Sequence, residues 1–232
     1  MKSTLQHFKR KREKMPRNKY PEETRQKIME TALELFLNKG YDETTVLDII
    51  ANLGGLTRGA FYHHFKSKDD VLDALFARFG VGMLPMEQAR EAKVSSGLER
   101  IRLLLKLSLQ SNTANKEITK LTGMVLELMQ KPRFFYERHL EMLEHISDIE
   151  PMVAEGMADG SIRKGNPRAY AEILMLLMNL WMIPHVFPPA SPQDLMDKGE
   201  IMYEMLEAIG LPVLDSEIDE LYVKTLKAIE KE

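Results

Sequence analysis

Residues 40–65 read GYDETTVLDIIANLGGLTRGAFYHHF, and this stretch decides the fold of the first part of the chain. Two short helical patterns flank a Gly54-Gly55 turn, and Thr45 and Thr57 stand where the N-caps of two helices belong. Two such helices joined by a glycine turn are typical of a helix-turn-helix, whose second helix can lie in the major groove of DNA. The stretch therefore predicts a DNA-binding protein.

The residues on either side of this stretch extend the helical pattern. Asp48, three residues after Thr45, predicts a capping box. Ser67 and Asp70 have the same spacing and predict a second capping box, at the start of the helix that follows the stretch. Before the stretch, apolar residues recur at helical spacing from Pro21 to Asn38, and Gly40 is placed to end that helix. We expect a bundle of short helices with the helix-turn-helix inside it.

The helix that Thr57 opens has two different faces. Phe61 and Phe65 lie four residues apart, share one face and are expected to be buried. Arg58, Tyr62 and His63 then point outward, and Arg58 can donate two hydrogen bonds to a guanine edge. His64 has two interpretations, a phosphate contact or a half-buried imidazole bonded to a carbonyl group, and Lys68 adds a positive charge beside the next helix start.

A family resemblance follows from these residues. TRQKIMETALELFLNKGYDETTV (24–46) and LTRGAFYHHFKSKDDVLDAL (56–75) resemble the DNA-binding domain of TetR-family transcriptional regulators. The resemblance implies an all-α homodimer, in which a three-helix DNA-binding domain precedes a larger helical domain that binds a small effector and dimerises. It implies repression that the effector releases, and it places the operator contacts on Thr45, Thr57, Arg58, Gly59, Tyr62, His63, His64 and Lys68.

The chain departs from the family pattern at two points. The segment between Thr45 and Thr57 is one residue longer than usual, and we place the extra residue in the Gly54-Gly55 turn. Leu47 occupies a position where members often have a polar or basic residue, so a DNA contact from the first helix of the motif is expected to be missing. A longer turn could re-aim the recognition helix.

Composition and charge set the remaining limits. The chain has 232 residues, 44% of them hydrophobic, and no Cys, which excludes disulfides, thiolate catalysis and Cys-ligated zinc and fits a reducing cytoplasm. Residues 1–80 hold 15 Lys and Arg against 11 Asp and Glu, whereas the remainder is acidic. We expect a basic arm over 1–20, a helix-turn-helix domain over 21–79 and a helical domain over 80–232. The arm either contacts DNA or is a solvated tail.

The second domain shows helical patterns throughout and no alternation typical of strands. Its most apolar run, residues 173–187, is interrupted by Asn179, Pro184 and His185, so it is too short and too broken to cross a membrane. The expected helices, separated by Pro, Gly and Asn signals, are 85–94, 97–112, 115–130, 133–145, 151–159, 167–183, 193–209 and 216–231.

Methionine and aromatic residues predict an effector pocket in this domain. Thirteen of the 16 Met residues follow residue 80, and Met side chains repack easily around apolar molecules of varied shape. The alternative is that these residues form an ordinary core. The candidate pocket residues are Phe134, Phe135, Met178, Trp181 and Met182.

Two late helices predict the dimer interface. Residues 167–183 are apolar nearly all round and 193–209 carry one broad apolar stripe, so both need covering by other protein surface. In a twofold dimer each pair of helices would meet its copy, although an internal core is the alternative. The candidate interface residues are Ile173, Leu177, Leu180, Ile201 and Met205.

An enzymatic or metal-binding function has little support. Glu137, Glu141 and His145 are four residues apart on one helix and could face a cation, but such residues are usually solvated charges. No phosphate-binding loop, nucleophile motif or dinucleotide fingerprint is present, so we expect no enzyme, no metal and no cofactor. The expected partners are an operator in double-stranded DNA, a small effector and a second copy of the chain. The alternatives are an architectural DNA-binding protein without ligand and a helical ligand-binding or interaction protein.

Overall fold

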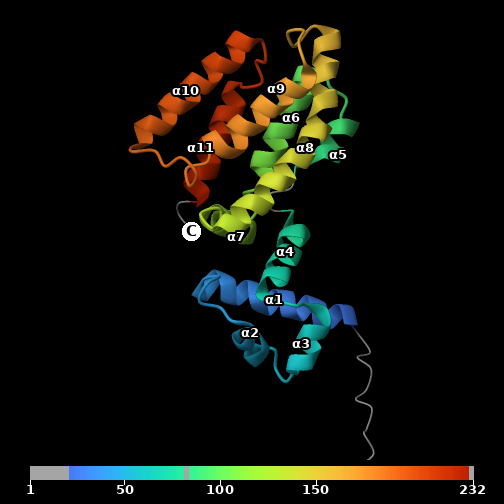
Figure 1. Ribbon diagram of the computed structural model, residues 1–232, viewed down its shortest axis with the longest axis vertical. Helices are drawn as coiled ribbons and strands as arrows, with labels where there is room; N and C mark the ends of the chain where they lie inside the picture. The colour runs from blue at the N-terminus through green and yellow to red at the C-terminus, as the bar shows by residue number, and fades with distance from the viewer. Residues whose placement is uncertain (1–20, 81–83, 230–232) are drawn as a thin grey trace, which may run out of the picture. The chain divides into compact units, whose positions relative to one another are not determined.

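The computed structural model describes residues 21–80 and 84–229, apart from the side chains of Arg138 and Pro192. Over these ranges the chain is all-α, as predicted, without a strand (Figure 1). The expected basic arm over 1–20 lies outside the described residues. The helices are α1 (Pro21–Lys39), α2 (Val46–Asn52), α3 (Arg58–His64), α4 (Lys68–Phe79), α5 (Met86–Glu91), α6 (Gly97–Ser111), α7 (Lys116–Leu128), α8 (Pro132–Asp159), α9 (Pro167–Leu176), the π-helix η1 (Leu177–Trp181), α10 (Pro192–Ile209) and α11 (Ser216–Ile229).

The chain forms two compact units that divide between Leu75 and Phe76, within α4 and four residues before the boundary we expected. In the first unit, α1 lies across α2 and α3, and the start of α4 completes the layer (Figure 1). Apolar side chains from all four helices are buried between them, so that this small unit has a core of its own. The core includes Ile28, Phe36, Ile49, Leu53, Phe61, Phe65, Leu72 and Leu75.

The predicted caps are present in this unit. The Thr45 hydroxyl accepts from the Asp48 backbone N–H at 3.1 Å, and the Asp48 carboxylate accepts from the Thr45 N–H at 2.8 Å, which closes the capping box. The Thr57 hydroxyl accepts from the Ala60 N–H at 3.2 Å at the start of α3. Ser67 accepts from the Asp70 N–H at 3.1 Å before α4.

The second unit is a helical bundle built on α8. This helix packs against α6 and α9, and α6 also contacts α5 and α11 (Figure 1). Gly97 and Gly156 let α6 and α8 approach closely, because a Cβ atom at Gly97 would collide with the backbone of Gly156. A buried cluster that runs from Ala89 to Ile218 forms the core of this unit. No described helix is long and apolar enough to span a bilayer.

Helix α8 corrects one expectation, since we predicted two helices, 133–145 and 151–159, and the structure has one. Pro151 lies inside the helix and cannot donate to the carbonyl of Ser147. Both residues are exposed, so water can satisfy that carbonyl group. Ile146, Ile149 and Met152 are buried on the opposite side and hold the helix against the core across the proline.

The predicted helix 167–183 is also interrupted. After α9 the backbone continues as the π-helix η1, in which the Met182 N–H donates to the Leu177 carbonyl, five residues back, at 3.0 Å. The Asn179 side chain donates to the Met175 carbonyl at 3.1 Å, and such a side-chain bond competes with the backbone pattern of an α-helix.

Candidate nucleic-acid interface

Helix α3 has the two faces that its sequence predicts. Phe61 is fully buried and Phe65 is 4% exposed, and their rings lie 6.2 Å apart in the core of the first unit. Arg58, Gly59, Tyr62 and His63 are exposed. The buried phenylalanines thus fix the orientation of α3, and its opposite face is open to a partner.

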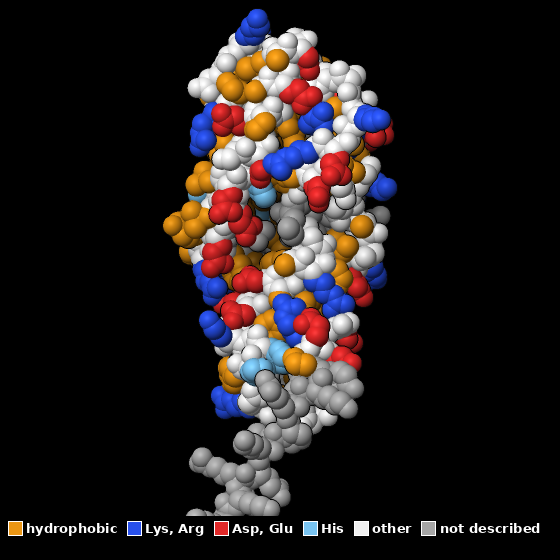
Figure 2. All heavy atoms as spheres, turned by 90° about the vertical axis from the view of Figure 1, so that its right-hand side faces the viewer, with side chains coloured by type: hydrophobic (Ala, Val, Ile, Leu, Met, Phe, Trp, Pro, Cys, Tyr) orange, Lys and Arg blue, Asp and Glu red, His pale blue; other side chains and the backbone are white. Residues whose placement is uncertain are grey.

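Arg58 and Tyr62 form the most prominent pair on this open face. The Arg58 guanidinium lies 5.7 Å from the centre of the Tyr62 ring, and this ring packs edge-on against Phe61 at 5.4 Å. Since a guanidinium offers a fork of donors and a phenol offers one more, the pair can bind base edges and phosphate oxygens. Figure 2 shows imidazole side chains and an apolar side chain at the surface of this unit.

The two histidines at the end of α3 differ in burial. Their rings lie 5.1 Å apart, His63 is exposed and His64 is half-buried. Burial lowers the pKa of His64, and the positive neighbours His63 and Arg25 lower it further. A neutral imidazole can still donate one hydrogen bond, so His64 suits a neutral contact with a phosphate rather than an ion pair.

The structure places Lys68 differently from the exposed residues of α3. Its ammonium group donates to the backbone carbonyls of Tyr41 at 2.7 Å, Thr44 at 3.0 Å and Asp42 at 3.3 Å. It also lies 4.3 Å from the centre of the Tyr41 ring. Lys68 therefore ties α4 to the turn after α1, and a phosphate contact would have to replace one of these bonds.

The turn of the helix-turn-helix contains two left-handed glycines. Gly54 has φ +63° and Gly55 has φ +98°, both in the region that favours glycine. Leu53 before them is fully buried, so the glycine pair reverses the chain between a fixed anchor and α3. Leu47 on α2 is 59% exposed and offers only an apolar surface.

Replacing Gly55 by alanine is expected to lower the free energy of unfolding by about 1–2 kcal/mol. The penalty comes from the backbone alone, because a Cβ atom at Gly55 would meet nothing within 4 Å. Urea denaturation followed by circular dichroism measures the change. Gly59→Ala is the matched control, since Gly59 lies in α3 without a positive φ, and there alanine should be neutral or stabilising. Equal losses in both variants would contradict this account.

The capping box should make stability depend on pH. The Lys39 ammonium, 2.8 Å from the carboxylate, and then the Thr45 N–H and hydroxyl lower the pKa of Asp48 from 3.8 to about 2. A pKa lowered by folding stabilises the protein above the unfolded value and ceases to do so as the pH falls through the folded value. We expect Asp48→Asn to lower the melting temperature at pH 7, and the difference from the unaltered protein to shrink as the pH falls from 4 and to vanish below pH 2. A difference as large at pH 2 as at pH 7 would contradict this.

The second unit contains two adjacent cavities, each of about 160 Å³, lined by α6, α7, α8, α9 and η1, with α11 at one of them. Of the five predicted effector residues, Phe135 lines one cavity and Met178 the other. Phe134, Trp181 and Met182 are in neither lining, and Met182 is buried in the core. Trp181 instead packs near Lys198, whose ammonium donates to the Trp181 carbonyl at 3.2 Å.

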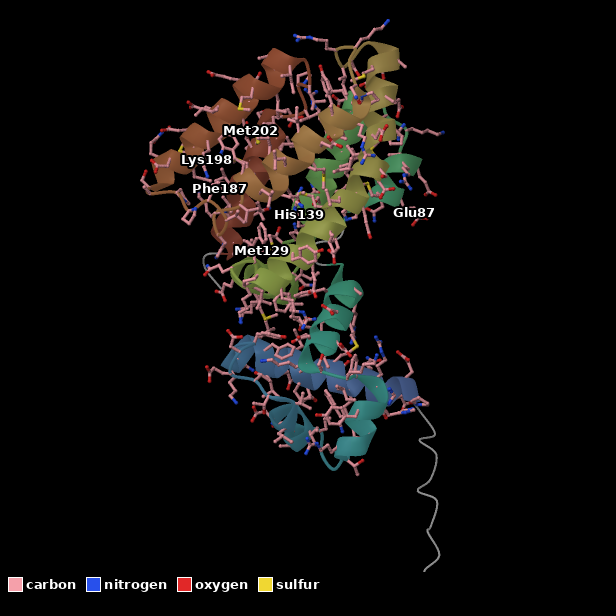
Figure 3. All side chains as sticks on the ribbon, viewed as in Figure 1. Glu87, Met129, His139, Phe187, Lys198 and Met202 are labelled. Atoms are coloured by element: carbon pink, nitrogen blue, oxygen red, sulfur yellow. The ribbon has the colours of Figure 1, made fainter. Side chains whose placement is uncertain are left out.

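Sequence reasoning missed the polar residues of these cavities. They include Ser108, Asn112, Thr122 and Asn179, together with His139 and His145 on α8. Figure 3 marks His139 on α8 and Met129 after α7, both of which line the first cavity. One sequence signal was available. Residues 142, 146 and 149 are apolar at helical spacing, and His139 and His145 lie at the edges of the helix face that they form.

The predicted dimer residues divide into two groups. Ile173, Ile201 and Met205 are exposed on α9 and α10, and Leu180 is half-buried. Leu177, by contrast, is 7% exposed and belongs to the core of the second unit, because the turn of α9 directs it inward. Leu176, which is 50% exposed, lies beside it on the open face and replaces it as a candidate.

The acidic and histidine residues of α8 do not gather around a cation position. Arg133 donates to Glu137 at 2.9 Å, and Glu141 and His145 line the first cavity. Over the described ranges, no group of three or more His, Asp or Glu side chains is placed to hold a metal ion.

Comparison with known proteins agrees with this arrangement. Residues 28–75 match the family described as bacterial regulatory proteins, tetR family. The regulator SrpR of Pseudomonas putida is 52% identical over 56 residues, which are 24% of this chain and 26% of SrpR. The repressor KstR2 of Mycolicibacterium smegmatis is 30% identical over 146 residues, 62% of this chain and 69% of KstR2. The chain thus matches about a quarter of SrpR and more than two thirds of KstR2.

Solved structures show the same fold. A transcriptional regulator of the TetR/AcrR family from Thermobifida fusca matches with a TM-score of 0.54 and 23% identity, over 79% of this chain and 96% of that one. The SmeT–triclosan complex matches with a TM-score of 0.55 and 21% identity, over 89% of this chain and 91% of SmeT. These relatives are named as transcriptional regulators. Since the similarity to KstR2 extends far beyond the helix-turn-helix, this chain belongs to the tetR family of bacterial regulatory proteins.

Proposed function

We propose that this protein is a homodimeric transcriptional repressor, which binds a roughly palindromic operator through α3 and releases it when a small effector enters the second unit. The observation that carries the proposal is the open face of α3, where Arg58 and Tyr62 are exposed opposite the buried Phe61 and Phe65. The repressor role is also supported by the similarity to KstR2, which is named a transcriptional repressor.

A dimer is supported by apolar side chains that remain open on α9 and α10. Ile173 and Leu176 on α9 and Ile201 and Met205 on α10 are exposed at helical spacing. Two copies that bury these faces against each other would form a four-helix contact and present two α3 helices to successive half-sites. Such a protein acts on DNA, so we expect it in the cytoplasm.

The effector would act through linkage between its cavity and the operator. A ligand can change operator affinity only to the extent that it binds the two conformations of the dimer with different affinities. A coupling free energy of about 1–3 kcal/mol corresponds to a roughly 5- to 150-fold change in operator affinity. Repression then follows from promoter occupancy, and release follows from the lower affinity of the effector-bound dimer.

Fluorescence anisotropy with DNA from the upstream region of its own gene tests the proposal. Specific binding should exceed binding to unrelated DNA, and log K should fall linearly with log salt, with a slope of about −0.9 per phosphate contacted. Specific binding that no small molecule from a broad panel alters would favour the ligand-free architectural protein. If no DNA were bound specifically, a helical ligand-binding or interaction protein would replace the proposal.

A further inference from the structure

The lining of the two cavities restricts the chemistry of the effector. Resting on the proposed function, we infer that the effector is an uncharged, largely apolar molecule with at least one hydroxyl group, which donates its proton to His145 or to Asn179. The inference depends on three features of the lining, namely its size and apolar walls, its charge, and the hydrogen-bonding groups left open to a ligand.

The walls favour an apolar molecule of two-ring size. Leu126, Met175 and Ile183 line both cavities, and Met142 and Leu180 line the first. Each cavity measures about 160 Å³, and an apolar cavity of about 150 Å³ can hold one benzene molecule. Since the two cavities share lining residues, a molecule that fills both would have about the size of two joined six-membered rings.

The charges of the lining oppose an acidic ligand. Among the described side chains, neither cavity is lined by Lys or Arg, whereas Glu141 lines the first. Among the described side chains a carboxylate ligand would therefore find no cationic partner and would lie near an acidic residue, and the burial of an unpaired charge is strongly unfavourable.

The imidazole of His145 offers an acceptor. Its Nδ1 is buried without a hydrogen-bond partner and lies 3.7 Å from a carboxylate oxygen of Asp148, which is itself paired with Arg90. The carboxylate favours a proton on Nδ1, and in a neutral imidazole the other nitrogen, Nε2, is then an acceptor. His145 can thus accept a hydrogen bond from a ligand hydroxyl group.

Asn179 on η1 offers a second acceptor to the cavities. Its amide nitrogen donates to the Met175 carbonyl at 3.1 Å and lies 3.7 Å from the Met175 sulfur, which assigns the nitrogen to the side toward Met175. The amide oxygen remains as the acceptor that Asn179 can offer to the two cavities it lines. His139 stands beside His145 in the lining, stacked on Phe135 at 6.5 Å, and supplies a flat wall for a ring.

Calorimetry of the full-length protein with four probes of one shape tests the inference. The probes are naphthalene, 2-naphthol, 2-naphthoate and 2-naphthylmethylammonium. We expect 2-naphthol to bind about 5- to 10-fold more tightly than naphthalene, because its hydroxyl group gains a hydrogen bond that the hydrocarbon lacks, and 2-naphthoate to bind most weakly. The inference is overturned if 2-naphthoate or the ammonium probe binds most tightly, or if no probe binds.

A double variant, its two single variants and one control assign the preference to the named residues. His145→Phe combined with Asn179→Leu should reduce the advantage of 2-naphthol over naphthalene to about 2-fold or less, while naphthalene binding is retained. The two single variants show which of the two residues accepts the proton. Tyr136→Phe removes a hydroxyl group from the exposed face of the same helix as His145 and should change neither affinity. A preference for 2-naphthol that survives in the double variant would refute the assignment.

Operator anisotropy with the same probes separates this inference from the proposed function. If 2-naphthol binds with the expected preference but leaves operator affinity unchanged, the site chemistry stands and the effector role of the cavity fails. If operator binding is specific but the probes bind in another order, the DNA-binding proposal stands and the inference about the effector fails.

Discussion

Replacing both Arg58 and Tyr62 by alanine is expected to weaken operator binding by at least about 100-fold at moderate salt. A bidentate arginine contact to a guanine contributes about 1–3 kcal/mol, and loss of the tyrosine removes a further hydrogen bond together with the ring that supports the guanidinium. Every 1.4 kcal/mol is a factor of ten in affinity. Because both side chains are exposed, the free energy of unfolding should change by no more than about 0.5 kcal/mol for each. Anisotropy titrations and urea denaturation measure the two effects.

The matched control is Arg133→Ala with Tyr136→Ala. It removes the same two residue types from exposed positions on α8 in the second unit, and should leave operator affinity within about 2-fold. Binding to unrelated DNA adds a second criterion, since the loss of a base contact lowers affinity for the operator more than affinity for unrelated DNA. If the Arg58 and Tyr62 variant lost affinity equally for both DNAs, the pair would be a phosphate contact without a role in sequence recognition.

The first unit was predictable from sequence because its signals are local. The capping residue Thr45 and its partner Asp48 lie within one helical turn. The four-residue spacing of Phe61 and Phe65 is enough to place both on one face of the helix. No tertiary information is needed to place Arg58 and Tyr62 on the opposite side. Lys68 is the exception, because its hydrogen bonds reach the turn at 41–44, more than twenty residues earlier in the chain.

The second unit was less predictable because packing there overrides local signals. Pro151 predicts a helix break, yet the burial of Ile146, Ile149 and Met152 against the core keeps α8 continuous. The η1 turn could not be anticipated from an apolar run, and it begins at Leu177, which is buried although we predicted it at the dimer interface. The cavity likewise depends on how five helices meet, so neither Asn179 nor the α8 histidines can be assigned to its lining from local sequence alone.

Charges introduced on the exposed faces of α9 and α10 are expected to produce a monomer. In Leu176→Glu combined with Ile201→Glu, two side chains that are 50% and 48% exposed in one chain would become buried carboxylates in the dimer. Burial of an unpaired charge costs several kcal/mol, so the dimer dissociation constant should rise by at least about 100-fold. Sedimentation equilibrium at micromolar concentration should then report the 26.7 kDa monomer instead of a species of about twice that mass.

The same variant links the dimer to operator binding. Each monomer keeps its α3 intact, but it loses the second half-site contact that a dimer gains without a further association step. We therefore expect operator affinity to fall by at least about 100-fold while the salt slope falls to about half, because half of the phosphate contacts are lost. Leu143→Glu, a charge at a leucine on α8 that is 45% exposed, is the control and should leave both mass and affinity unchanged. A double variant that stays dimeric would show that α9 and α10 do not form the dimer contact. A monomer that binds the operator as tightly as before would show that this contact is not what brings two α3 helices to the two half-sites.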